Sequence, residues 1–355
     1  MSLSKGNLNI AEVYKGGLPI AEIYKGSDLV WKKADKFMLK QYLYLDGLPS
    51  GYSPRDVFFS QDGYCFVTCR DGALRVYDDD GVLKTTFNFK SSTNVGSGNT
   101  SSSWCNTIVG DSNNLYLNDH SSDKVYVLSY SGYTVTFNKI YNSGNKYIYS
   151  SYLYNGYLYQ VNSERGKQKL IKMDVSTGNI TTIYNCPFSN DYLMGLTLDE
   201  DTGNIYLIYQ GGGDSSQYMS ANIALIKLAP DGTVLKNVGL FNNPNLDNSL
   251  DNVEGICFDN NGYLYTCQRV SKRLDSVNQS IIGAQVWQGG TDIYDKNLNL
   301  VLKDTVANEP YLHDGTYMTV SRIRYNKYKN LLICFNDTSY GHLYSIPPYR
   351  FGQGA

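Results

Sequence analysis

Residues 57–69 read VFFSQDGYCFVTC, which is an apolar run, a turn rich in Asp and Gly, and a second run that carries aromatics. The same pattern returns five more times along the chain. The further copies are TIVGDSNNLYLND from Thr107, SYLYNGYLYQV from Ser151, LTLDEDTGNIYLIY from Leu196, ICFDNNGYLYTC from Ile256 and RIRYNKYKNLLIC from Arg322. Short apolar runs joined by Asn, Asp and Gly are typical of paired β-strands. The sequence therefore predicts six strand–turn–strand units.

The spacing of these units is that of propeller blades. The first apolar residues after the turns are Tyr64, Leu115, Tyr157, Ile205, Tyr263 and Leu331, which are 51, 42, 48, 58 and 68 residues apart. Propeller blades recur every 40 to 50 residues or so, and loop insertions lengthen the spacing. Third and fourth strands follow the first unit as ALRVYDDDG and VLKTTFNF. We predict an all-β propeller of about six four-stranded blades, with five or seven blades as alternatives.

One strand near the start of the chain has no blade of its own. The last unit has a third strand at His342 to Ile346 but no fourth, whereas FMLKQYLYL, from Phe37 to Leu45, precedes the first unit. We expect this early strand to complete the last blade, because ring closure protects sheet edges. The expected organisation is a leader over residues 1–34, a propeller over 35–350 and a tail over 351–355.

Composition and charge agree with a β-rich protein. The chain has 33 Tyr and 33 Gly, residues suited to pleated surfaces and to tight turns. Its 31 basic and 33 acidic residues are interspersed, so no nucleic-acid partner is predicted. Apolar stretches long enough for membrane insertion and a secretory signal are not found. The seven cysteines are scattered, and we expect reduced packing residues.

The leader contains a tandem repeat. IAEVYKG begins at Ile10 and IAEIYKG begins at Ile20, and both predict short strands broken at Gly16–Gly17 and at Gly26. A lone pair of strands is marginal in water, so this segment should gain stability from a partner or from the propeller. Attachment to a partner is one interpretation. The alternative is a duplicated hairpin that packs under the propeller.

The phrase YKGSDLVWKK from Tyr24 resembles an element of the type YKGSxLVW, found near the ends of tail, fibre and other structural proteins of bacteriophages. The propeller is also similar in architecture to receptor-binding proteins of some phages. The resemblance implies a virion protein in a multi-copy assembly, made in the host cytoplasm without a signal peptide, whose leader binds other virion proteins. The docking residues that it implies are Tyr14, Lys15, Gly16, Tyr24, Lys25, Gly26, Leu29 and Trp31.

Two segments exceed a hairpin turn, namely Gln210 to Asn222 and Gln268 to Gly290, and we expect both to project from one face. Tyr, Ser, Gly and Asn are common in adaptable recognition surfaces. Aromatic faces with nearby amides suit a host-cell glycan. The candidate ligand-binding residues are Trp104, Tyr209, Tyr218 and Trp287. The alternative is that such aromatics fill the spaces between blades.

Catalytic motifs for nucleotide, zinc-protease or serine-hydrolase chemistry are not found in the sequence. NVEGICF, in which Glu254 leads an inner strand, resembles the corresponding strand of lactonase-type six-bladed propellers that bind calcium. That resemblance implies Ca²⁺ held by Glu254 with Asn118 and Asp119, in a lactonase or esterase-like hydrolase. The favoured interpretation is instead a structural or binding protein with no catalytic residue and no cofactor.

Overall fold

The computed structural model describes residues 40–348 with gaps at 50–51, 53, 102, 163, 165–166, 188–191, 212–221, 242–247, 273–285, 303–305, 308–321 and 336–340. Before residue 40 it describes only the backbone of short strands between residues 13 and 38. At strand ends that border the larger gaps, the description also covers the backbone alone.

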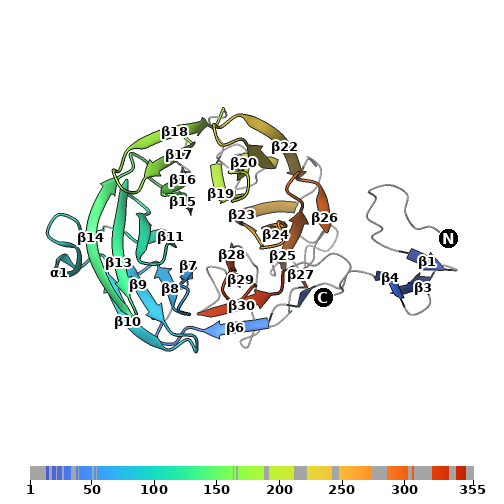
Figure 1. The fold of residues 1–355 in the computed structure, drawn as a ribbon, viewed down its shortest axis with the longest axis horizontal. Coiled ribbons are helices and arrows are strands. Elements are labelled where there is room, and N and C mark those ends of the chain that lie inside the picture. The colour runs from blue at the N-terminus through green and yellow to red at the C-terminus, as the bar shows by residue number, and fades with distance from the viewer. Residues whose placement is uncertain are drawn as a thin grey trace, which may run out of the picture.

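Six antiparallel sheets of four strands form a ring (Figure 1). Blade 1 consists of β7 (Pro54–Phe59), β8 (Cys65–Cys69), β9 (Ala73–Tyr77) and β10 (Leu83–Asn88). Blade 2 consists of β11 (Cys105–Gly110), β12 (Asn114–Asp119), β13 (Lys124–Ser131) and β14 (Thr134–Asn142). Blade 3 consists of β15 (Ile148–Tyr154), β16 (Tyr157–Asn162), β17 (Lys169–Asp174) and β18 (Ile180–Asn185).

The other three blades follow the same plan. Blade 4 consists of β19 (Tyr192–Leu198), β20 (Ile205–Gly211), β21 (Asn222–Leu228) and β22 (Val234–Phe241). Blade 5 consists of β23 (Asn248–Phe258), β24 (Leu264–Lys272), β25 (Val286–Tyr294) and β26 (Leu300–Leu302). Blade 6 consists of β28 (Arg322–Asn326), β29 (Leu331–Phe335), β30 (His342–Ile346) and β6 (Lys40–Tyr44). The predicted six-bladed propeller is confirmed, and the alternatives of five and seven blades are excluded.

The wide spacing of the later units comes from longer strands, from insertions within blades 4 and 5, and from the long connection between β26 and β28. β23 has 11 residues, and β24 and β25 have 9 each, whereas β8 and β9 have 5. Both ends of the segment from Gln268 to Gly290, predicted as one projecting loop, therefore belong to strands, and residues 273–285 lie outside the described residues. Its β-ladder runs on to the pair Lys272 and Val286. The segment after Gln210 is likewise shorter than predicted, because β20 and β21 still pair at Gly211 and Asn222.

The N-terminal strand closes the ring, as predicted. β6 pairs with β30, with Leu43 opposite Leu343, and supplies the outer strand of blade 6. The predicted single strand over Phe37–Leu45 is divided, because β5 (Phe37–Met38) pairs in parallel with β27 (Val306–Ala307). Blade 1 contacts the closing strand closely: a Cβ on Gly81, whose φ is +81°, would lie 2.1 Å from the carbonyl oxygen of Tyr44.

The core consists of six apolar clusters, and each one fills the space between two neighbouring blades. Both faces of a middle strand meet another blade, so β8 and β9 are buried along their whole length. In outer strands such as β10, more exposed side chains alternate with less exposed ones. Cys257, Cys267 and Cys334 lie in the cluster between blades 5 and 6. Six of the seven cysteines are buried, which agrees with their predicted role in packing, and Cys186 is half-buried.

The leader forms two separate hairpins at the predicted positions. β1 (Val13–Lys15) pairs with β2 (Leu18–Ile20), and β3 (Glu22–Lys25) pairs with β4 (Asp28–Lys32). Each sheet has two strands and pairs with no blade in the part of the leader that is described. The side chains predicted to dock, from Tyr14 to Trp31, lie outside the described residues.

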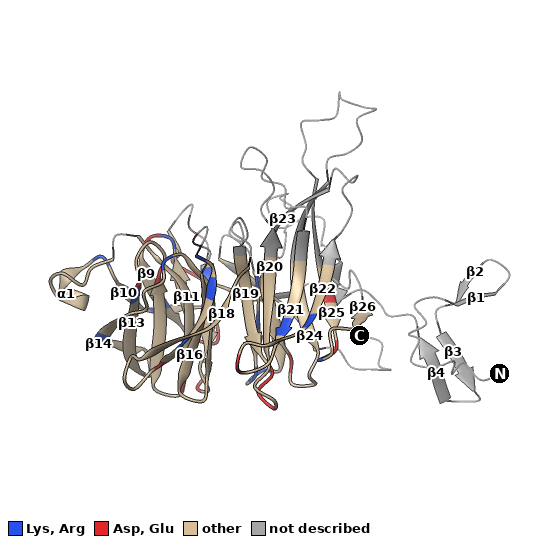
Figure 2. Ribbon diagram, turned by 90° about the horizontal axis from the view of Figure 1, so that it is seen from above, with Lys and Arg blue, Asp and Glu red and all other residues tan. Residues whose placement is uncertain are grey.

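Charged residues of both signs are interspersed over the described ribbon (Figure 2). The short α1 (Ser92–Val95) is the helix that the structure describes. No described helix has the length and apolar character needed to cross a membrane.

Candidate functional site

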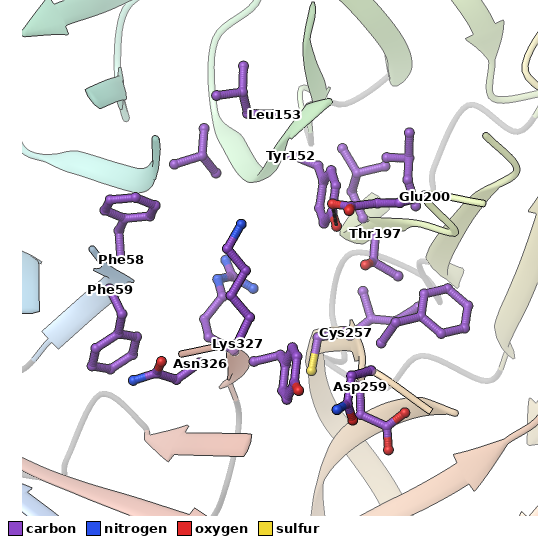
Figure 3. Close-up of a pocket in the computed structure, with 18 of the residues that line it drawn as sticks. Phe58, Phe59, Tyr152, Leu153, Thr197, Glu200, Cys257, Asp259, Asn326 and Lys327 are labelled. Atoms are coloured by element: carbon purple, nitrogen blue, oxygen red, sulfur yellow. Dashed lines mark hydrogen bonds between the residues drawn. The ribbon is translucent and has the colours of Figure 1, made fainter. Parts of the chain in front are cut away.

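The first strands of the six blades surround a central cavity of about 390 Å³ (Figure 3). Its walls are the carboxyl ends of β7, β11, β15, β19, β23 and β28 together with the turns that follow them. Labelled lining residues in Figure 3 include Phe58, Phe59, Tyr152, Glu200, Cys257, Asp259 and Lys327. Every blade contributes, so the cavity exists only in the closed ring.

A buried ion pair lies beside this cavity. The guanidinium of Arg324, a lining residue, donates from Nε and Nη2 to the two carboxylate oxygens of Asp56 at 2.8 and 2.9 Å. Asp56 has no exposed surface, and its Oδ2 also accepts the backbone N–H of Ile108 at 3.1 Å. These bonds join blades 6, 1 and 2. The two residues of the pair are 268 positions apart, so the sequence alone does not reveal their contact.

A neutral polar network joins blades 2 and 3. The amide nitrogen of Asn118 donates to the hydroxyls of Thr107 and Ser151 at 2.6 and 2.8 Å. Its oxygen accepts from Gln160. Asn118 is completely buried, and both ends of its amide are used between blades. Asn118, which the hydrolase interpretation proposes as a calcium ligand, thus has its amide hydrogen-bonded between blades.

Asp119, the second alternative ligand, organises a loop. Its carboxylate accepts the backbone N–H groups of Ser121 and Ser122 at 3.0 and 3.1 Å, and the hydroxyls of Ser101 and Ser103. Its charge is thus balanced by protein donors. The side chain of Glu254 lies outside the described residues. In the part of the chain with described side chains, no cluster of three or more His, Cys, Asp or Glu could hold a metal ion.

Polar residues around the cavity mouth are tied to their neighbours. Lys296 bridges Asp199 and Asp201 at 2.6 and 2.7 Å. Burial opposes ionisation of Asp199, but the hydrogen bonds from Lys296 and Thr202 hold its pKa below the usual range. Tyr152 donates to the Glu200 carboxylate at 2.9 Å. Figure 3 shows Lys327 pointing toward the centre of the cavity. The mouth therefore offers charges of both signs to a ligand.

Two titratable side chains that line the cavity are shifted toward their protonated forms by burial. Burial raises the pKa of the Cys257 thiol well above its usual value, which keeps it protonated and weakly nucleophilic. Burial also raises the pKa of Asp259, although its carboxylate accepts the hydroxyl of Tyr265 at 2.9 Å. Burial therefore disfavours the ionised forms of both Cys257 and Asp259 at the cavity wall.

The predicted platform Trp104 lies in the connection that leads into β11. Its ring stacks on His120 at 4.6 Å with an interplanar angle of 13°, and the Arg70 guanidinium lies 5.8 Å from its centre. The rings of Tyr147 and Tyr149 meet His120 edge-on at 5.4 and 5.9 Å. The structure thus brings Trp104 into an aromatic cluster between blades 2 and 3.

The other predicted ligand-binding aromatics do not join Trp104. Tyr209 lies in β20, is 8% exposed and packs in the cluster between blades 3 and 4, because its strand is covered by the neighbouring blade. It therefore belongs to the core rather than to a recognition surface. Trp287 lies in β25 opposite Ser271, and its side chain is outside the described residues, as is all of Tyr218.

The imidazole of His120 is held neutral by its surroundings. Burial, and after it the positive charge of Arg55, lower the pKa of His120 to about 4, although Asp119 opposes this shift and Arg70 and Arg322 add to it. The unfolded chain takes up a proton near pH 6.5, whereas the folded chain does not until about pH 4. Titration of His120 therefore does not change the free energy of unfolding above pH 6.5. That free energy falls as the pH drops from 6.5 to about 4.

We expect His120→Gln to remove this pH dependence. Between about pH 7 and pH 4 the wild type should lose about 2 kcal/mol more unfolding free energy than the variant. Denaturant titrations of both proteins across this range give the difference, in which the other titrating groups cancel. Parallel curves for the two proteins would contradict the neutral, buried state of His120.

The comparisons with known proteins support the fold. No family model matches the sequence, and no curated protein matches it. The structure is similar to the WD40 domain of Pan2 from Neurospora crassa, with a TM-score of 0.55 and 10% identity, over 89% of this chain and 97% of that one. It is also similar to a member of the DUF4221 family from Bacteroides vulgatus, with a TM-score of 0.53 and 8% identity, over 88% and 98% of the two chains.

A third similar structure is a chain of the mitotic checkpoint complex, with a TM-score of 0.52 and 10% identity, over 85% of this chain and 79% of that one. At such low identity these similarities show the propeller fold and carry no function with them.

Proposed function

We propose that this protein is a non-enzymatic component of a bacteriophage particle, associated with the tail or a fibre. In this proposal the leader docks the protein to other virion proteins. The propeller then presents a binding face to a host-cell glycan or to a neighbouring virion protein.

The pairing of the leader strands is the observation that carries the docking half of the proposal. Each copy of the IAE-YKG repeat supplies one strand of its own hairpin, as in Val13 opposite Ile20 and Glu22 opposite Lys32. Isolated two-stranded hairpins are marginally stable in water. A duplicated pair of them gains stability when a partner covers the strands, and sequence duplication matches a partner that is itself repeated. The YKGSDLVW phrase covers the second hairpin and its turn.

The central cavity supports the binding half. It is large enough for a small ligand or an inserted side chain, and its mouth combines aromatic walls with the charges of Glu200 and Lys327. The calcium-dependent hydrolase has weaker support. Asn118 is committed to Thr107, Ser151 and Gln160, and Asp119 is committed to a loop of backbone and serine donors.

Deleting residues 1–34 tests the docking role. We expect the truncated protein to keep the unfolding temperature of the propeller but to be absent from particles, at least tenfold below wild type in purified virions. The deletion removes both hairpins and leaves the ring-closing β6 in place. Quantitative immunoblotting of particles assembled with each form gives the comparison.

A matched variant separates docking from production of the protein. Lys327→Met changes the cavity mouth and leaves the leader intact, so it should enter particles at the wild-type level. Full incorporation of the truncated protein would refute docking through the leader.

A further inference from the structure

A second pocket, of about 480 Å³, lies at the opposite edge of blade 3 from the central cavity. β15 and β16 pair from Tyr154 and Tyr157, at the central cavity's end, to Ile148 and Asn162 at the other end. The pocket is formed at this other end, where the connection from blade 2 meets the ends of β16, β17 and β18. Its described lining residues include Gly144, Asn145, Asn162, Gln168, Lys169 and Asn185.

Three buried amides in this pocket have unused hydrogen-bonding capacity. Asn145 and Asn162 are 1% exposed and Gln168 is 3% exposed. Within the described part of the chain, no partner is present for Nδ2 and Oδ1 of Asn145, Nδ2 of Asn162 or Nε2 of Gln168. The Oδ1 of Asn162 does accept the backbone N–H of Lys169 at 2.8 Å, which fixes the direction of that amide. Buried polar groups are destabilising unless they are hydrogen-bonded. A polar ligand bound in the pocket would supply the missing partners of these amides.

The described lining of the pocket carries little net charge. Glu164 and Lys167 at the rim form an ion pair of 2.7 Å, and the Lys167 side chain is 69% exposed, so the pocket reaches solvent there. Lys169 is the other charged residue among those described in the lining. The unpaired groups are three amide donors and one amide acceptor. Neighbouring hydroxyl groups, each both donor and acceptor, can pair with all four groups, whereas a carboxylate or a fully ionised phosphate has no donor for the Asn145 oxygen.

An exposed aromatic ring lies two residues from the pocket along the chain. Tyr147 follows Asn145 in the connection between blades 2 and 3 and is 41% exposed. Its φ of 54° is in the left-handed region, which non-glycine residues seldom adopt. The hydrogen bond from its N–H to the carbonyl oxygen of His120, at 3.0 Å, holds this conformation. A partly exposed aromatic ring two residues from Asn145 is suited to stacking on the apolar face of a sugar that extends out of the pocket.

We propose that the pocket formed by Asn145, Asn162 and Gln168 binds a neutral sugar residue, with Tyr147 providing a stacking surface at its edge. This site goes beyond the proposed function, because it is separate from the central cavity. It also does not depend on the leader or on a virion partner.

The test uses the full chain and a panel of free neutral sugars, namely glucose, galactose, mannose, rhamnose, N-acetylglucosamine and N-acetylgalactosamine. Saturation-transfer NMR identifies the members that bind, and titration gives their Kd. Gln168→Met keeps the length of the side chain and removes its amide. We expect binding of at least one sugar by the wild type and a Kd about tenfold higher in the variant, which corresponds to about 1.4 kcal/mol.

Two further variants make the result specific. Tyr147→Gly removes the ring at a backbone conformation that glycine adopts readily, so it should fold, and we expect severalfold weaker binding. If Gln168→Met does not fold, the proposal is tested with Tyr147→Gly alone. Lys90→Met, at an exposed position of blade 1, should leave the Kd unchanged, and Lys327→Met reports whether a sugar binds in the central cavity instead. The proposal is overturned if no sugar in the panel binds, if glucuronate or inorganic phosphate binds more tightly, or if only Lys327→Met weakens binding.

Discussion

Replacing Asp56 by Ala should lower the free energy of unfolding by about 3 to 5 kcal/mol, the usual loss when one member of a buried ion pair is removed. Asp56 is fully buried, and the paired Arg324 side chain is only 18% exposed. The substitution leaves that guanidinium without its carboxylate and removes the acceptor of the Ile108 N–H. Three blades would be affected together. Urea denaturation followed by tyrosine fluorescence measures the loss.

A second ion pair between blades 1 and 6 provides the control. Lys329 and Asp79 are 2.9 Å apart but 44% and 51% exposed, so Asp79→Ala should cost less than about 1 kcal/mol. The double variant Asp56→Ala/Arg324→Met removes both buried charges, and we expect it to be more stable than Asp56→Ala alone. Equal losses for Asp56→Ala and Asp79→Ala, or simple additivity in the double variant, would contradict this role of the buried pair.

The fold could be predicted because its signals are local. Each turn is marked by Asp, Asn or Gly within a few residues, and the predicted starts of the second strands agree with the structure to within one residue, as at Tyr64 against Cys65. Closure of the ring could be predicted from the number of strands, because the last blade had only three strands and the N-terminal strand belonged to no other blade. Strand length in blades 4 and 5 was less predictable, because long pairing depends on which residues meet across the ladder.

The candidate sites depend on contacts that the sequence does not encode locally. Asp56 and Arg324 are 268 residues apart and meet only because the ring brings blade 6 back to blade 1. Asn145 and Gln168 resemble ordinary loop amides in the sequence, and only the fold shows that both are buried in one pocket. For Tyr209 the sequence suggested a ligand-binding residue, whereas the structure places it in the core. Aromatic alternation in a strand is the same whether a neighbouring blade or a ligand covers the ring.

Extending the N-terminal deletion from residue 34 to residue 45 should abolish the stable, monomeric propeller. The longer deletion removes β6 with Leu43, and Leu45 directly after it; these side chains are 7% and 1% exposed in the cluster between blades 6 and 1. Burial of such side chains contributes about 1.5 to 3 kcal/mol each. The deletion also exposes the edge of β30, and a free strand edge promotes aggregation. Size-exclusion chromatography and thermal unfolding compare the two truncations.

Complementation distinguishes loss of this strand from a general effect of truncation. A synthetic peptide of residues 35–50, added to the longer deletion during refolding, should restore a monomeric species by pairing Leu43 with Leu343. The same peptide with Leu43→Asp should not, because the charge would face the apolar cluster. If the longer deletion unfolds at the same temperature as the shorter one, β6 does not stabilise the ring. The six inter-blade clusters would then hold the ring without covalent continuity between its first and last blades.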